Sequence, residues 1–238
     1  MLSVKKSCSN ARDLINANFY DCSKILFVTL TYAENMTDVK RLYKDVHNFI
    51  KKFKRHYPSC DAYFIAVEPQ GRGAWHCHII FRFIDDVPFI NDLSILWTHG
   101  FVYISKRLTD INNLGVYLSS YLCDVEFNDD NCREITLNGG HYDIKDVFEK
   151  EFVDIDGSTK KKKFIKGGRL WMYPPKMNIF RHSKNLIKPR SELLTYNNAL
   201  KKVGSALPTF RSCNLITSTD FSNLVIYEQY NTKINNSQ

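Results

Sequence analysis

Two histidines, His76 and His78, alternate with apolar residues in the segment Trp75-His76-Cys77-His78-Ile79-Ile80-Phe81. In a β-strand, alternate side chains point to the same face, so both imidazoles share one face and the apolar residues line the other. Two charged imidazoles side by side repel each other, whereas two neutral ones can bind one cation. A lone His-x-His pair is commonly structural, but its neighbours here favour a metal site.

The first of these neighbours is Glu68, which ends the preceding predicted strand. A hairpin turn at Pro69 to Gly73 brings Glu68 back beside His76, because cross-strand Cβ atoms are only about 5 Å apart. Two imidazoles and one carboxylate form a compact site for Mn²⁺ or Mg²⁺, with open positions for substrate oxygens. The two glycines of the turn permit the close approach of a nucleic-acid backbone.

A second group of interest is the segment Gly115-Val116-Tyr117-Leu118-Ser119-Ser120-Tyr121. On a helix, residues four apart are neighbours, so Tyr117 and Tyr121 project from one face. Aromatic pairs at this spacing usually pack in a core. Beside a metal site the same pair is a candidate for nucleophilic chemistry, provided that a base or the ion activates a phenol whose ordinary pKa is about 10.

The elements that position these residues follow from hydrophobic periodicity. Strands are predicted at 24–32, 62–68, 75–83 and 101–104, with 62–83 forming a hairpin. Helices are predicted from Thr37 or Asp38 to about Arg55, briefly at 90–97, and at 110–123. This alternation around antiparallel hairpins predicts an α+β fold.

The charge is distributed unevenly along a chain whose net charge is +8. The segment 159–190 holds eleven Lys or Arg and no acidic residue, and it also contains aromatic residues. Cations interleaved with rings suit a groove that binds phosphates and stacks bases. The run from Lys160 to Lys163, taken alone, is typical of a solvated face.

Four segments are expected from these patterns: an irregular N-terminal arm at 1–23, a core at 24–124, an acidic inserted hairpin or small strand unit at 125–158, and a basic extension at 159–238. The seven cysteines are scattered and form no Cys-x-x-Cys pair, which argues against a disulfide framework or a cysteine zinc site. No apolar run long enough for a membrane span and no signal peptide is found, so a cytoplasmic location is expected.

The three groups of residues together resemble the HUH endonucleases, and more narrowly the rolling-circle replication initiators of small plasmids, phages and mobile elements. Phe27-Val28-Thr29-Leu30-Thr31-Tyr32 is similar to the first strand motif, Gly73 to His78 to the metal motif, and Tyr117 to Tyr121 to the tyrosine motif. Trp97-Thr98-His99-Gly100-Phe101-Val102 also resembles the link between the last two. The resemblance covers roughly residues 24–124.

This resemblance implies a sheet of about five antiparallel strands with helices packed on one face. It also implies a metal-dependent nick in single-stranded or hairpin origin DNA, a 5′-phosphotyrosine adduct and a free 3′-OH primer. Tyr117 is then the nucleophile and Tyr121 the second tyrosine of a relay. The sequence departs from the family where Ser120 replaces the usual lysine three residues after the first tyrosine, a cation that Lys106 or Arg107 could supply.

The remaining DNA contacts are expected from residues near the metal face and in the basic segment: Thr29, Thr31, Arg72, Lys106, Lys176, Arg181 and Lys184. No Walker-type phosphate loop is found, so a host helicase and a polymerase are expected partners. Three alternatives stay open. They are a transposase or relaxase with the same chemistry, a non-catalytic single-stranded nucleic-acid-binding module, and a metal-dependent hydrolase that uses water.

Overall fold

A computed structural model of the chain describes residues 2–105, 124–153 and 159–230. It confirms the α+β class: helices accompany a five-stranded antiparallel sheet. The chain divides into two compact units, residues 1–188 and 189–238, and each is described by itself.

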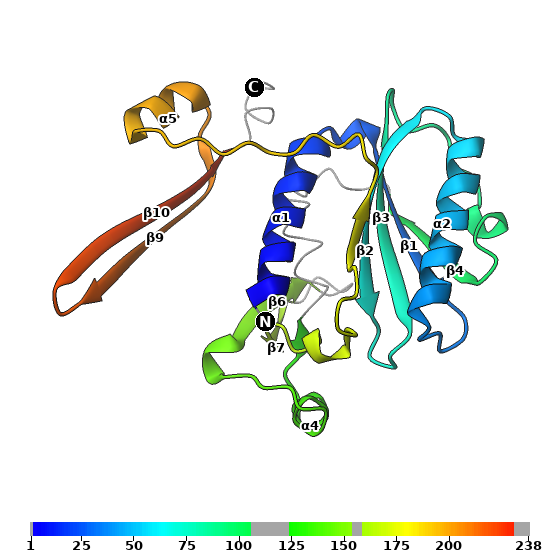
Figure 1. Cartoon of the computed structure of the whole chain (residues 1–238), viewed down its shortest axis with the longest axis horizontal. Helices are drawn as coiled ribbons and strands as arrows, with labels where there is room; N and C mark the ends of the chain where they lie inside the picture. The colour runs from blue at the N-terminus through cyan, green and yellow to red at the C-terminus, as the bar shows by residue number, and fades with distance from the viewer. Residues whose placement is uncertain (1, 106–123, 154–158, 231–238) are drawn as a thin grey trace. The chain divides into compact units, whose positions relative to one another are not determined.

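The central sheet of the first unit has the strand order β4-β1-β3-β2-β8 (Figure 1). Its strands are β1 (Ile25–Tyr32), β2 (Cys60–Pro69), β3 (Trp75–Phe83), β4 (Gly100–Ser105) and β8 (Phe180–His182). The four longer strands confirm the predicted ones to within a few residues. The short helix predicted at 90–97 is wrong in extent, since only a 3-10 turn forms at Leu93–Ile95. The helix predicted at 110–123 lies outside the described residues.

Helix α2 (Val39–His56) covers one face of the sheet. It begins where predicted, because the Asp38 side chain accepts hydrogen bonds from the backbone N–H groups of Lys40 and Arg41. Its apolar stripe packs on the face of β3 that carries Cys77, Ile79 and Phe81, with the Phe53 and Phe81 rings stacked at 3.8 Å between centroids. The apolar half of the His-x-His strand is therefore core, as its alternation predicts.

The N-terminal segment differs from its prediction: it forms helix α1 (Leu2–Asn18) rather than an irregular arm. Ala11 and Ile15 are buried against Phe27, Phe64 and Ile80 on the sheet face opposite to α2 (Figure 1). The helical spacing of a narrow apolar stripe provides the driving force, but the polar residues around that stripe concealed it. As a result, both faces of the sheet carry a helix.

A smaller three-stranded sheet follows, in the order β5-β7-β6. Its elements are β5 (Val125–Glu126), helix α4 (Asp129–Leu137), β6 (Val147–Val153) and β7 (Thr159–Ile165). This arrangement agrees with the expected small strand unit in the acidic segment. However, β6 and β7 pair from Val147 to Ile165, so the expected boundary between residues 158 and 159 falls inside a hairpin. Acidic and basic residues of the two segments therefore share one sheet.

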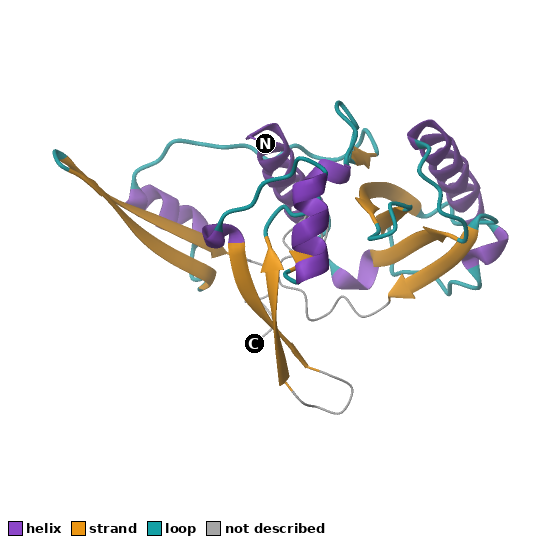
Figure 2. Ribbon diagram, turned by 90° about the horizontal axis from the view of Figure 1, so that it is seen from below, coloured by secondary structure: helices purple, strands orange, loops and turns teal. Residues whose placement is uncertain are grey.

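The second unit contains helix α5 (Tyr196–Val203) and a long hairpin of β9 (Pro208–Ser218) and β10 (Phe221–Tyr230). Figure 2 shows this hairpin as an extended two-stranded ribbon. Within the described part of the chain, no helix combines the length and the apolar character needed to cross a membrane.

Candidate metal and nucleic-acid site

The strand register brings the predicted site residues to one face of the sheet. Glu68 of β2 lies directly opposite His76 of β3, as the hairpin predicts. On the other side of β3, Thr31 is opposite His76 and Thr29 is opposite His78. Directly opposed residues of antiparallel strands project to the same face, so all five side chains share the face that α2 does not cover.

A tight turn fixes this register. The backbone N–H of Gln70 donates to the carbonyl of Ala74 (2.7 Å), and that of Gly73 donates to the carbonyl of Gln70 (2.8 Å). Gly73 has φ +87°, a conformation that favours glycine. Arg72 does not reach the carboxylate, because it donates to Gln70 Oε1 (2.9 Å) and to the Tyr32 carbonyl (2.8 Å).

His78 contacts Glu68 through one ring nitrogen and a threonine through the other. Nε2 lies 2.7 Å from Glu68 Oε2, and Nδ1 lies 3.1 Å from Thr29 Oγ1. A carboxylate can only accept, so the proton of this contact belongs to Nε2. The Thr29 hydroxyl can donate or accept, and it therefore satisfies Nδ1 in either tautomer of His78.

His76 has a different environment, since its Nε2 atom is buried and has no hydrogen-bond partner among the described residues. Burial lowers the pKa of His76 to about 4, an effect that Glu68 opposes and that His78, Arg72 and Arg169 reinforce. The ring is therefore neutral at pH 7, and its nitrogen can offer a lone pair to a cation or another donor.

Arg169 is the residue of this site that the sequence patterns do not reveal. Its Nη1 atom forms an ion pair with Glu68 Oε1 and lies 3.5 Å from the Pro69 carbonyl. The segment that carries it is fastened nearby by the Tyr173 hydroxyl, which donates to the Val67 carbonyl (3.0 Å). No sequence spacing connects Arg169 with Glu68, because the two lie about a hundred positions apart.

The donor set fits a divalent ion in chemistry but is not assembled around one. Two imidazole nitrogens and a carboxylate stand on adjacent positions of one face, and the unpartnered His76 Nε2 is a ready ligand. Across the described ranges, no three His, Cys, Asp or Glu side chains are already arranged to hold an ion. Both Glu68 oxygens are engaged, one by His78 and one by Arg169.

Two exposed aromatic residues extend this face along the sheet edge. Tyr103 of β4 is opposite Thr29, and Phe101 is opposite Thr31. They are 66% and 72% exposed, although they belong to a central-sheet strand. Their alternation could have been recognised from the sequence, because the strand Phe101-Val102-Tyr103-Ile104 places both rings on the face of the histidines. Exposed rings of this kind can stack with nucleobases.

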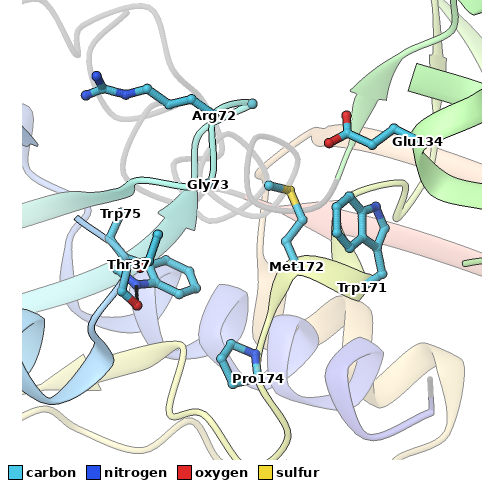
Figure 3. A pocket seen from close by; sticks show the side chains of 9 residues that line it. Thr37, Arg72, Gly73, Trp75, Glu134, Trp171, Met172 and Pro174 are labelled. Carbon is cyan, nitrogen blue, oxygen red and sulfur yellow. Dashed lines mark hydrogen bonds between the residues drawn. The ribbon is translucent and has the colours of Figure 1, made fainter. Parts of the chain in front are cut away.

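A cavity of about 510 Å³ lies beyond the Gly71–Gly73 turn (Figure 3). Its walls include Trp75 and Thr37 on one side and Trp171, Met172 and Glu134 on the other. In Figure 3 the Arg72 guanidinium extends away from Glu134, consistent with its bonds to Gln70 and Tyr32. The opening therefore combines aromatic and acidic walls, with no cation pointing into it from Arg72.

The other predicted DNA contacts are more dispersed. Arg181 pairs in register with Ile65 on the face covered by α2, and its guanidinium lies 4.7 Å from the centroid of the Tyr43 ring. Arg181 therefore projects away from the histidines. Lys176 and Lys184 are exposed outside the strands. Lys106, Tyr117 and Tyr121 lie outside the described residues.

Part of the basic segment is paired with acids rather than free for phosphate. Lys162 lies 3.2 Å from Glu126, and Lys161 lies 3.7 Å from Glu149, across the small sheet. Surface pairs of this kind stabilise little. Nevertheless, they reduce the net positive charge that β7 presents, as the interpretation of this run as a solvated face suggests.

A comparison with protein families finds one similarity in the region of the site. Residues 25–126 match the family of replication-associated proteins that is described by its ORF2 members. The match covers β1 to β5 and less than half of the chain. Searches among curated proteins and among solved structures find no match.

The pKa of His76 gives a direct test of this geometry. Because burial disfavours the imidazolium, the ring should titrate near pH 4 and stay neutral at pH 5.5, where an ordinary histidine is mostly protonated. The folded state then binds fewer protons than the unfolded state between about pH 6.5 and 4, so this group makes folding less favourable as the pH falls through that range.

Histidine ring signals followed by NMR would measure this midpoint. The exposed His47 of α2 is the internal reference. A midpoint for His76 near 6.5 would show that its ring is not buried as described.

Proposed function

We propose that the chain is a rolling-circle replication initiator: a metal-dependent endonuclease and ligase that nicks single-stranded or hairpin origin DNA through a tyrosine. Two findings support the proposal. The region of the site matches a family of replication-associated proteins, and the sheet register gathers Glu68, His76 and His78 on one face. The observation that carries it is the buried, unpartnered Nε2 of a neutral His76 beside a carboxylate.

In this function Glu68, His76 and His78 hold Mn²⁺ or Mg²⁺. When bound, the ion neutralises charge on the non-bridging oxygens of the scissile phosphate. Thr29 keeps the His78 ring oriented through Nδ1, so that Nε2 can face the ligand. Phe101 and Tyr103 offer rings for the bases that flank the scissile bond, on the same face.

The nucleophile of the proposal is Tyr117, with Tyr121 as the second tyrosine. The phenol oxygen forms a bond to phosphorus, the bond from phosphorus to the 3′ oxygen breaks, and that oxygen leaves as a 3′-OH after taking up a proton. The phosphoester is conserved in the 5′-phosphotyrosine, so resealing needs no further energy source. Strand separation and synthesis would come from a host helicase and a polymerase.

A gel assay on labelled single-stranded DNA from the origin region of the replicon tests this function. Wild type with Mn²⁺ should give a slowly migrating, protease-sensitive adduct that chelator abolishes. His76→Ala should lose the adduct, and Tyr117→Phe and Tyr121→Phe should identify the nucleophile. His47→Ala, a change in an exposed histidine of α2, is the matched control and should retain it.

Other outcomes of this assay point to the competing functions. Cleavage without an adduct would identify a hydrolase that uses water. Binding without cleavage of any strand, unaffected by chelator, would identify a non-catalytic binding module. Cleavage directed by the ends of a mobile element or by a transfer origin would identify a transposase or relaxase.

Thr29→Val tests the support of His78 separately from catalysis. The substitution removes the hydroxyl that contacts Nδ1, and lost second partners of metal-binding histidines typically cost about 10–100-fold in metal affinity. Calorimetric titration with Mn²⁺ would measure this loss. Thr31→Val is the matched control, because Thr31 is the next residue of β1 on the same face and has no hydrogen bond to either imidazole among the described residues. Equal effects of both variants would rule out the specific contact.

The exposed rings of β4 are tested by DNA affinity without metal. Base stacking contributes about 1–3 kcal/mol per base, so Phe101→Ala and Tyr103→Ala should each weaken single-strand binding by about tenfold. Fluorescence anisotropy in chelator would measure the change. Phe89→Ala, which removes an exposed ring from outside the strands, should have little effect. Full affinity in both β4 variants would exclude these rings as a DNA platform.

A further inference from the structure

The Glu68 carboxylate is shared between two partners that compete with any added cation. Oε2 faces His78 Nε2 at 2.7 Å, and Oε1 forms the ion pair with Arg169. The Glu68 side chain is only 11% exposed, so water cannot replace a lost partner easily. A carboxylate this buried requires a positive or hydrogen-bonding neighbour at each oxygen.

We propose that Arg169 is an exchangeable counter-ion: it neutralises Glu68 while no divalent ion is bound, leaves Glu68 when the ion binds, and then binds the phosphate of the DNA. This inference rests on the metal site of the proposed function. It assigns to Arg169 a role in ion affinity and in DNA contact, and it makes the two events dependent on each other.

The exchange follows from charge and geometry. An ion shared by Glu68, His76 and His78 would stand beside the guanidinium that contacts the same carboxylate. Like charges this close repel strongly where burial limits the screening by water. The ion also needs a lone pair of Glu68, and both oxygens are already engaged. Ion binding and the Arg169–Glu68 pair therefore oppose each other.

The free hydrogen-bonding capacity of Arg169 indicates where the guanidinium goes. Its Nε atom is buried and has no partner among the described residues, while Nη1 serves Glu68 and approaches the Pro69 carbonyl. A guanidinium can give two parallel hydrogen bonds to a phosphate, which Nε and a terminal nitrogen supply together. A phosphate brought to the metal face would satisfy this unused donor.

Arg72 provides the matched comparison. It is a second cation near His76 and adds to the same positive field. Its guanidinium donates to the Tyr32 carbonyl and to Gln70, not to Glu68. Removing Arg72 therefore changes the charge near the site and leaves the carboxylate contact intact.

Calorimetric titration of the full chain with Mn²⁺, without DNA, tests the first half of the proposal. Arg169→Gln should bind Mn²⁺ about tenfold or more tightly than wild type, because charge-assisted contacts no longer have to be broken. Arg72→Gln should stay within about threefold of wild type, since it removes only a screened charge. Melting curves with and without Mn²⁺ would show a folded state and a larger rise in Tm for Arg169→Gln.

The outcomes separate this inference from the proposed function. If neither wild type nor Arg169→Gln binds Mn²⁺, the metal site is wrong and the exchange is wrong with it. If wild type binds Mn²⁺ and Arg169→Gln binds no tighter, the exchange alone is overturned. An equal gain in Arg169→Gln and Arg72→Gln would also overturn it, because the effect would be general charge.

Single-strand binding in Mn²⁺ tests the second half, with Tyr117→Phe and Tyr121→Phe combined to prevent cleavage. In that background Arg169→Gln should lower DNA affinity and reduce the slope of log affinity against log salt by about 0.7, the loss of one phosphate contact. Arg169→Lys keeps the charge and should retain the slope. An unchanged slope in Arg169→Gln would show that the displaced guanidinium does not reach the phosphate.

Discussion

The buried carboxylate of Glu68 is the constraint on which the rest of the site depends. It lies at the end of β2, opposite His76, in contact with His78 and paired with Arg169. Removing one partner of a buried ion pair typically costs about 3–5 kcal/mol, because the other charge is left without compensation. The fold must therefore bring two distant segments, the β2–β3 hairpin and the chain after β7, to the same point.

The register of the central sheet meets half of this requirement. A slip of one residue between β2 and β3 would turn Glu68 toward the α2 face and bury it among apolar side chains. Such a slip is opposed by the core itself, since Cys77, Ile79 and Phe81 fill the α2 face in the observed register only. The packing that stabilises the fold thus also determines which residues meet at the site, and the Gly73 turn keeps the hairpin short enough for direct opposition.

Much of this could be predicted from the sequence because it is local. The alternation in Trp75 to Phe81 predicts which face is core, and the short hairpin predicts that Glu68 meets His76; both are confirmed. The expectation for α1 was wrong because few apolar residues among many polar ones give a weak helical signal. Arg169 could not be predicted, since nothing in the sequence near it encodes a partner about a hundred residues earlier. The tyrosine pair stays a prediction, because it lies outside the described residues.

The small sheet meets the other half of the requirement, and this gives the acidic segment a structural role. Gly168 packs so closely that a Cβ atom there would lie 2.4 Å from Val125 Cγ1 and 3.3 Å from both Ile135 Cδ1 and Ile165 Cβ. Those three residues come from β5, α4 and β7, so the acidic and basic segments together form the surface on which Gly168 rests. Arg169 is the next residue, and its direction toward Glu68 follows from that contact. The acidic insertion then acts less as a shield for the basic segment than as the support that delivers one of its cations to the site.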